Sequence, residues 1–446
     1  MTIVLIKIIQ VIIALSVLIL IHETGHFTFA KLFKIRVDKF FLFFDTGGFK
    51  LLSTKSGWFS KLFPLFKNSE TEYGIGWLPL GGYCKINGMI DESFDTSNLK
   101  EEPKPWEFRV KPAWQRLLVM VGGVLYNFIF AILLFICILW IWDKTYIKNS
   151  DISIYASPLA EEMGFKTGDK ILKLDDYTPD DFGAIQADIV RKDIRKVQVL
   201  RGTDTLDIYI DRNLISKILN TPEMFSIAVP FVVDTIPTMS PNYNKGLLKG
   251  DKIIAIDGKQ IRFVQDSKPI LQAHPTEKFS ATVVRGNDTL SMPLSTDSLG
   301  RALIYAQIPG IVKKEYNALT AIPAGIKMTS TTISDYLKDL KMVASPSTGA
   351  YKSVGSFISI GQAFPGTWDW YRFLYMLSML SIMLGVMNLL PIPALDGGHI
   401  LFTLYEMVSG KKPSDKFLVV AQAVGMVILL GLLILAFGND VGRLIH

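Results

Sequence analysis

The chain has 446 residues, of which 49% are hydrophobic and 20% are charged, and its mean hydropathy is +0.32. This balance argues against an ordinary soluble multidomain protein. The formal net charge of +6 is modest for this length, and no basic run alternates with aromatic residues, so a nucleic-acid partner has no support. The two cysteines, Cys84 and Cys137, are too few for a disulfide framework or a cysteine-based zinc site.

Four apolar segments approach or exceed the roughly 20 helical residues that cross a membrane. They cover residues 3–21, 117–142, 373–390 and 417–437. The first segment runs directly into His22 without a small-residue cleavage site, so it predicts a retained span and not a secretory signal peptide. The composition therefore predicts a polytopic helical membrane protein.

The first span ends in the motif "HETGH", residues 22–26. His22 and His26 are four residues apart, so on a helix both imidazoles project from one face and can share a metal ion, while Glu23 can reach a metal-bound water. Ionisable residues within a spanning segment are rare and indicate function. The simpler alternative is a polar helix end outside the lipid. Two imidazoles leave a catalytic zinc ion one protein ligand short.

Between the first two spans, "VDKFFLFF" from Val37 and "YGIGWLPLGGYCKI" from Tyr73 contain the aromatic and β-branched residues that strands favour. In the second span, Gly122, Gly123 and Asn127 indicate close packing between helices. The sequence thus predicts strands in the first loop and a tight helix contact at the second span.

The long insert, residues 143–372, contains an internal repeat with a period of roughly 80 residues, which suits two copies of a small domain. "SPLAEEMGFKTGDKILKLDD" from Ser157 matches "SPNYNKGLLKGDKIIAIDG" from Ser240, and "VLRGTDTL" from Val199 matches "VVRGNDTL" from Val283. Alternating apolar residues beside Gly-Asp turns predict short strands. Both copies resemble the PDZ family, which implies a groove for an extended peptide, although neither has a clear Gly-Leu-Gly-Phe loop. Two structural β domains without a ligand are the alternative.

Apolar residues at helical spacing in 312–343 predict an amphipathic helix, either along the membrane surface or packed against a domain. The next motif, "NLLPIPALDGGH" at residues 388–399, closes the third span and offers Asp396 and His399 as candidates for a third metal ligand. A helix from Ile3 to His22 is about 29 Å long. His22 therefore lies near the far end of the first span, at the depth to which the chain returns after the third.

Basic residues near the helix ends predict the orientation of the spans. The loop between the first two spans carries Lys31, Lys34, Arg36, Lys39 and Lys50 at its start and Lys100, Lys104, Arg109, Lys111 and Arg116 at its end. We therefore expect this loop to be cytoplasmic, with both termini and the insert on the opposite face.

A His-Glu-x-x-His motif at the end of a first span, with Asn-x-x-Pro-x-Pro-x-Leu-Asp-Gly after a later one, resembles the site-2 protease family of intramembrane zinc metalloproteases. The tandem PDZ-like repeats make the chain similar to the RseP-like branch (regulator of sigma-E protease), as do "GGVLYN" from Gly122 and "PLGGYCK" from Pro79. The resemblance implies that His22, His26 and Asp396 bind Zn²⁺ and that Glu23 is the catalytic base. His399 is then a bystander or a group behind the ligands.

The resemblance also implies supporting roles for residues near the metal. Gly123 and Asn127 would support the site, and the Asn388 amide could hold a substrate backbone group or an oxyanion, unless it makes only a polar contact between helices. An unwound substrate helix needs new hydrogen-bond partners in lipid. A strand that contains Gly82 and Tyr83 could supply them.

The implied function is cleavage of single-span membrane proteins, such as anti-sigma-factor-like proteins or remnant signal peptides, in a bacterial inner membrane. The implied partners are these substrates, an upstream site-1-type protease and the lipid bilayer, with the active site near the cytoplasmic face and the PDZ-like domains on the periplasmic side. Two other classes stay open. One is a catalytically silent scaffold that binds envelope peptides, and the other is a membrane-anchored zincin that acts on soluble peptides.

The expected fold class is a polytopic α-helical membrane protein of four transmembrane helices, with cytoplasmic β-hairpin or loop elements and two inserted PDZ-like α+β domains. The expected segments are 1–33 (first transmembrane helix), 34–113 (cytoplasmic loop with strands), 114–142 (second transmembrane helix), 143–225 and 226–311 (PDZ-like domains), 312–369 (outer helices and linkers), 370–410 (third transmembrane helix, Leu-Asp-Gly turn and a short helix) and 411–446 (fourth transmembrane helix).

Overall fold

The computed structural model describes residues 2–55, 69–89 and 102–445. The chain forms two compact units. One, the membrane unit, comprises Met1–Asp143, Glu315–Ala344 and Tyr351–His446, and the other, the inserted unit, comprises Lys144–Lys314 and Ser345–Ala350. The predicted cytoplasmic loop, 34–113, includes residues 56–68 and 90–101, which lie outside the described part.

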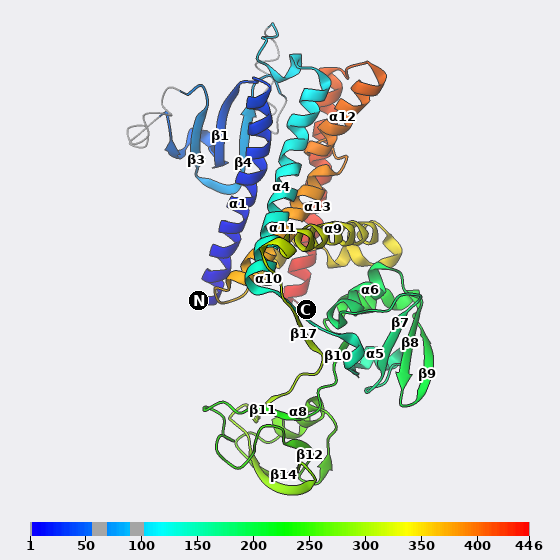
Figure 1. Cartoon of the computed structure of the whole chain (residues 1–446). Coiled ribbons are helices and arrows are strands. Elements are labelled where there is room, and N and C mark those ends of the chain that lie inside the picture. Colours follow the sequence, from blue (N-terminus) through cyan, green and yellow to red (C-terminus); the bar gives the residue numbers. More distant parts are fainter. Residues whose placement is uncertain (1, 56–68, 90–101, 446) are drawn as a thin grey trace. The chain divides into compact units, whose positions relative to one another are not determined.

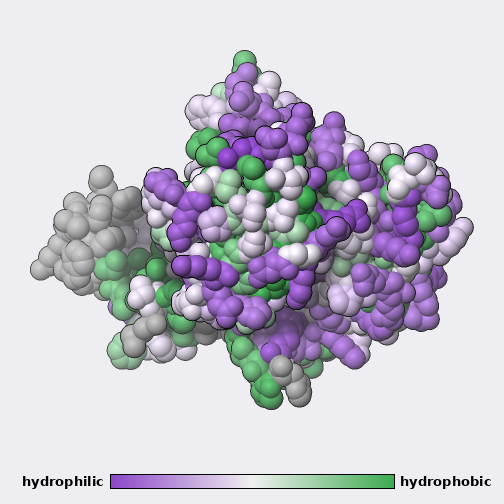
Figure 2. Space-filling model, turned by 90° about the horizontal axis from the view of Figure 1, so that it is seen from below, coloured by the Kyte–Doolittle hydropathy of each residue, from purple (hydrophilic) through white to green (hydrophobic). Residues whose placement is uncertain are grey.

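Among the described residues, four helices are long and apolar enough to cross a membrane: α1 (Thr2–Leu32), α4 (Ala113–Trp142), α11 (Trp370–Leu389) and α13 (Asp415–Ile445). Helix α4 packs lengthwise against both α1 and α11 (Figure 1). Exposed Ile, Leu and Val side chains cover the outer sides of α1 and α13, which suits contact with lipid. Hydrophilic side chains cover most of the face shown in Figure 2, with hydrophobic patches between them.

Helices α1 and α4 approach each other at glycines. A Cβ atom on Gly25 would collide with the Gly122 carbonyl, and one on Gly122 would stand 2.7 Å from the Phe29 ring. Small residues at such a contact let two helix backbones come together without side chains between them. The predicted close packing at Gly122 is therefore present, and it fixes the face of α1 that carries His22 and His26 against α4.

A four-stranded sheet lies beside α1 (Figure 1). Its strands are β1 (Val37–Phe44), β2 (Lys50–Ser53), β3 (Glu72–Gly76) and β4 (Leu78–Ile86), in the order β2-β3-β1-β4. The predicted strands occur, and the segment from Tyr73 is divided between β3 and β4, which do not pair with each other. Instead β1 lies between them, parallel to β3 and antiparallel to β4. Its aromatic run suits a central strand covered on both faces, and β4 becomes an edge strand.

The amphipathic helix is shorter than expected. Helix α9 spans Ala318–Val343, whereas residues Ile311–Lys314 form β17, which pairs with β5 (Lys144–Ile147). Asn317 ends the extended segment because its side chain accepts hydrogen bonds from the backbone N–H groups of Leu319 and Thr320, an N-cap. One face of α9 packs against α4 and α11 through a group that includes Met328, Ile333, Tyr336 and Leu340.

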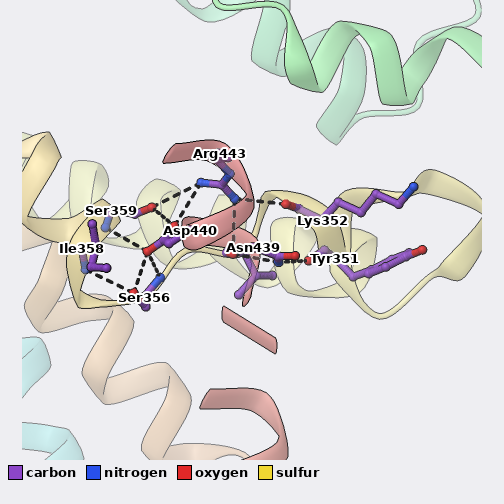
Figure 3. A network of polar contacts seen from close by, with 9 residues as sticks. Tyr351, Lys352, Ser356, Ile358, Ser359, Asn439, Asp440 and Arg443 are labelled. Atoms are coloured by element: carbon purple, nitrogen blue, oxygen red, sulfur yellow. Dashed lines mark hydrogen bonds and ion pairs between the residues drawn. The ribbon is translucent and has the colours of Figure 1, made fainter. Parts of the chain in front are cut away.

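A polar cluster ties α10 (Phe357–Ala363) to the C-terminal end of α13 (Figure 3). The buried Asp440 carboxylate accepts hydrogen bonds from the backbone N–H and hydroxyl of Ser356 and from the N–H of Ser359. Arg443 donates to the Lys352 carbonyl, and Asn439 donates to the Tyr351 carbonyl. An ionisable group near a helix end in an apolar protein is thus fully satisfied.

The inserted unit contains two similar sheets, one in each sequence repeat. The first repeat holds β6 (Ile154–Ala156), α5 (Pro158–Glu162), β7 (Lys170–Leu174), α6 (Ile185–Arg191), β8 (Lys196–Arg201), β9 (Asp204–Tyr209), α7 (Ile215–Asn220) and β10 (Phe225–Ile227). The second holds β11 (Val233–Thr235), β12 (Lys252–Ile256), β13 (Lys259–Gln260), α8 (Val264–Gln272), β14 (Lys278–Arg285), β15 (Asp288–Ser295) and β16 (Tyr305–Ala306). The sheet orders are β7-β8-β9 and β13-β12-β14-β15.

Equivalent contacts recur in the two repeats. The Arg201 guanidinium donates two hydrogen bonds to Asp169, each of 2.8 Å, and Arg285 donates two of 2.7 Å to Asp251. Each arginine also donates to the carbonyl of an equivalent glycine, Gly164 or Gly246. The matching "GDKI" and "RG" letters of the sequence repeat therefore encode the same buried ion pair twice.

Candidate metal centre

The two histidines of the first span lie on the face of α1 that packs against α4. His22 and His26 are 8% and 6% exposed, and their ring centroids are 4.8 Å apart. Their Nε2 atoms stand 3.2 Å from each other. Spacing of four residues on a helix produces this convergence.

Asp396 comes from a separate part of the chain. It is the first residue of α12 (Asp396–Ser409), which follows the proline-rich turn after α11. Gly397 and Gly398 make the turn possible, because a Cβ on Gly397 would collide with Leu390, and one on Gly398 would stand 2.7 Å from the Ile392 carbonyl oxygen. The Oδ2 atom of Asp396 lies 3.2 Å from His22 Nε2 and 3.3 Å from His26 Nε2.

These three atoms have the separation that a tetrahedral zinc ion requires. Ligands about 2.0–2.1 Å from zinc stand about 3.3 Å from one another, and the observed separations are 3.2, 3.2 and 3.3 Å. Two imidazole nitrogens and one carboxylate oxygen form a donor set that suits catalytic zinc and leaves a fourth position open. Burial raises the pKa of Asp396, but the two neighbouring imidazoles lower it by more than burial raises it. The pKa of Asp396 is therefore below its ordinary value. A carboxylate must be ionised to bind a metal ion.

Helix α4 contacts the outer Nδ1 atoms of the two rings, and helix α11 contacts His22 at its inner Nε2 atom. His26 Nδ1 lies 2.8 Å from the Val119 carbonyl, and His22 Nδ1 lies 3.1 Å from the Asn127 side-chain nitrogen. A Cβ on Gly123 would stand 2.5 Å from His26 Nε2 and 2.6 Å from His22 Cε1, so only glycine leaves room for the rings. The Asn388 amide nitrogen lies 3.2 Å from His22 Nε2.

A cavity of about 610 Å³ opens beside the three donor atoms. Glu23 and Cys84 both line it. The neighbouring wall is strand β4, including Gly82 and Tyr83. The residues predicted for the metal site and its support thus line this cavity or lie against His22, as Gly123, Asn127 and Asn388 do.

His399 also lines the cavity, one helical turn beyond Asp396. Burial lowers its pKa below the ordinary value for histidine. Among the described residues, the group whose ligand atoms lie within 4.8 Å of one another consists of His22, His26 and Asp396. Of the two candidates for a third donor, the geometry therefore favours Asp396.

Several residues at the cavity were not predicted from the sequence. The Val119 carbonyl is a backbone group, so no side-chain type could have indicated it. Gln422 and Met426 of α13 line the cavity as well. Gln422 is 3% exposed and is the polar residue within the otherwise apolar stretch 417–437 of α13. A buried amide in a spanning helix indicates function, so this residue could have been identified from the sequence.

Comparison with known proteins agrees with this geometry. The model of peptidase family M50 matches residues 10–432. The chain belongs to this family, the site-2 proteases. It is 28% identical over 464 residues to a chain from Xylella fastidiosa (strain 9a5c) that carries the name zinc metalloprotease, with 96% of this chain and 97% of that one covered. It is 27% identical over 461 residues to a regulator of sigma E protease from Haemophilus influenzae, with 97% and 98% covered. This site-2 protease is a zinc metalloprotease.

Proposed function

We propose that this site-2 protease cleaves single-span membrane proteins within or near their transmembrane segments, with His22, His26 and Asp396 as zinc ligands. The observation that carries the proposal is the convergence of these three donors, from a spanning helix and a distant turn, beside a cavity that also holds Glu23. Anti-sigma-factor-like proteins and remnant signal peptides fit this description, and an upstream site-1-type protease would shorten the former first.

The roles of the residues follow from their positions. Zinc, when bound, supplies the Lewis acidity that makes water nucleophilic and polarises the scissile carbonyl. Glu23 takes the water proton and later delivers it to the leaving amine. The Asn388 amide, next to His22, is placed to donate a hydrogen bond to the developing oxyanion.

The edge strand β4 is the proposed binding place for the unwound substrate. A peptide bond inside a helix is protected by its own hydrogen bonds, and a locally extended segment in lipid needs replacements for them. Strand β4 is an edge of the sheet, and its residues from Gly82 to Ile86 line the cavity. The substrate would therefore extend the sheet by one strand.

The inserted unit is proposed to consist of two PDZ-like domains that exclude substrates with long outer domains. Its support is the pair of similar small sheets and the shared ion pairs of the two repeats. By the predicted topology this unit is periplasmic, and the cavity lies near the cytoplasmic face of a bacterial inner membrane.

The deciding experiment compares the wild type with Glu23→Gln in proteoliposomes that contain a single-span test substrate. We expect wild-type cleavage and a loss of at least about a thousandfold in the variant, while the zinc content of both proteins stays at one ion per chain. A soluble peptide with the same cleavage sequence serves as the second substrate. Cleavage of the soluble peptide alone would favour a membrane-anchored zincin, and zinc-loaded wild type that cuts neither substrate would favour a silent scaffold.

A second experiment tests the edge strand. Proline introduced singly from Tyr83 to Ile86 removes a backbone donor and distorts the strand, whereas alanine at the same position keeps the backbone. We expect cleavage to be abolished only by proline, with zinc retained by both variants. Unchanged cleavage by the proline variants would remove the strand from the mechanism.

A further inference from the structure

The amide of Asn127 has one buried atom without a partner. Asn127 lies on α4 and is 0% exposed. Its nitrogen faces His22 Nδ1 at 3.1 Å, but its carbonyl oxygen makes no hydrogen bond with any described residue. A buried acceptor that is left unsatisfied destabilises a protein, so this oxygen requires a donor.

The chemistry of His22 supplies that donor. Its Nε2 atom converges with His26 Nε2 and Asp396 Oδ2, so the lone pair that binds a metal is on Nε2. A neutral imidazole with its Nε2 lone pair in use carries its hydrogen on Nδ1 and must donate it. An amide NH₂ group cannot accept this hydrogen. A half-turn of the Asn127 amide about its Cβ–Cγ bond exchanges the positions of its oxygen and nitrogen. The amide oxygen then accepts the hydrogen of His22 Nδ1, so the oxygen has a donor and the imidazole has an acceptor.

His26 shows the same arrangement with an acceptor that is fixed. Its Nδ1 atom lies 2.8 Å from the Val119 carbonyl, which can only accept. Val119 and Asn127 are eight residues apart on α4, so they lie on the same face of that helix, with Gly123 halfway between them. Helix α4 therefore offers one acceptor to each ring and no side chain where the rings themselves lie.

We propose that Asn127 is a positioning residue whose carbonyl oxygen accepts the Nδ1–H of His22 and thereby raises the affinity of the centre for zinc. The proposal rests on the proposed function only for the identity of the metal ligands. An acceptor behind a ligating imidazole fixes the orientation of the ring and increases its basicity, and loss of such an acceptor typically weakens metal binding about 10–100-fold.

The test measures zinc affinity and not cleavage. For full-length protein in detergent, zinc is set by competing chelators, and Co²⁺ absorption reports the ligand geometry. We expect Asn127→Leu, which has a similar volume but no acceptor, to raise the zinc dissociation constant about 10–100-fold and to change the Co²⁺ spectrum. Asn127→Asp can accept but cannot donate, and we expect it to bind zinc at least as tightly as the wild type.

Ser381→Ala is the matched control. The Ser381 hydroxyl donates to the backbone carbonyl of Asn127 at 2.8 Å, so this variant disturbs the same helix contact and leaves the amide in place. We expect wild-type zinc affinity. The proposal is overturned if Asn127→Leu binds zinc like the wild type, or if either Asn127→Asp or Ser381→Ala is weakened as much as the leucine variant. Should the leucine variant not fold, Asn127→Ala takes its place. None of these outcomes depends on a cleavage assay. The zinc affinities would therefore still test the role of Asn127 if the proposed function were wrong.

Discussion

Asp396 of the membrane unit and two buried aspartates of the inserted unit have different partners. In the inserted unit, Asp169 and Asp251 have side chains that are 1% exposed, and an arginine binds each of them with two hydrogen bonds. In the membrane unit, Asp396 faces two imidazoles. A guanidinium is permanently charged and satisfies a carboxylate by itself, whereas neutral imidazoles offer lone pairs that a metal ion can share with the carboxylate. The partner therefore distinguishes a structural aspartate from a candidate ligand.

The strongest test of this difference between the aspartates is to remove each carboxylate in turn. We expect Asp396→Asn to lose at least about a thousandfold in proteolysis, the scale of loss when an essential catalytic group is removed, and to lose zinc. The measurements are cleavage of a membrane-embedded substrate and metal content after dialysis. Asp251→Asn is the control and should keep both zinc and cleavage. Equal losses in the two variants would show that the partner of an aspartate does not predict its role.

The next effect concerns the space around the ligands. Gly123→Ala places a methyl group against both imidazole rings, and we expect activity to fall about a hundredfold because displacement of reacting groups by about 1 Å has that effect. Gly431→Ala in α13 is the control, since a Cβ there has no atom within 4 Å. Both changes improve helix propensity equally. A fully active Gly123→Ala variant would mean that the rings do not need this glycine.

A smaller effect is expected from Asp169 in the inserted unit. Asp169→Asn weakens the hydrogen bonds from Arg201 and from the Lys166 backbone N–H, and we expect the first repeat to lose about 2 kcal/mol of stability. Hydrogen exchange in peptides from β7 and β8 would detect the loss, while zinc binding stays unchanged. Asp204→Asn, at an exposed position in the same repeat, should leave the exchange rates as they are.

Features that depend on local sequence patterns could be predicted from the sequence. The spans, the strands at 37–44 and in 73–86, and the metal motif follow from local patterns such as hydrophobic runs and helical spacing. The repeat was visible because matching letters encode matching contacts. From the residues alone, Asp396 was one of two candidates for the third donor. The family resemblance favoured it, and in the structure it lies next to both histidines.

Local sequence patterns did not predict which strands and backbone groups pair in the tertiary structure. Consecutive strands usually pair with each other, but β1 lies between β3 and β4 and pairs with both. The strand character of each segment does not contain this pairing. The strand β17 was missed because Ile311–Lys314 is short and gains its partner, β5, from more than 160 residues away in the chain. The Val119 carbonyl is a backbone group that every residue carries, so only the fold selects it.

The smallest expected effect distinguishes the two repeats by their response to acid. The hydrogen bond from Arg285 lowers the pKa of Asp251, and the hydrogen bond from Arg301 lowers the pKa of Asp297. In the unfolded chain both groups would titrate near pH 3.9. Because the folded pKa values are the lower ones, the stabilisation is fully present above about pH 4 and is lost as the pH falls through the folded values.

In the first repeat, Asp193 has a lowered pKa as well, through hydrogen bonding to Arg195, but its side chain is 54% exposed and screened by solvent. The Asp251–Arg285 pair has its equivalent in the first repeat, Asp169–Arg201, but the second repeat carries the Asp297–Arg301 pair in addition. Because of this additional pair, we expect amide exchange in β12 and β14 to accelerate more between pH 6 and pH 3 than in β7 and β8, after correction for the intrinsic pH dependence of exchange. Asp297→Asn should reduce that difference, because an asparagine does not titrate. Equal acceleration in both repeats would show that the acid response comes from the whole unit and not from these ion pairs.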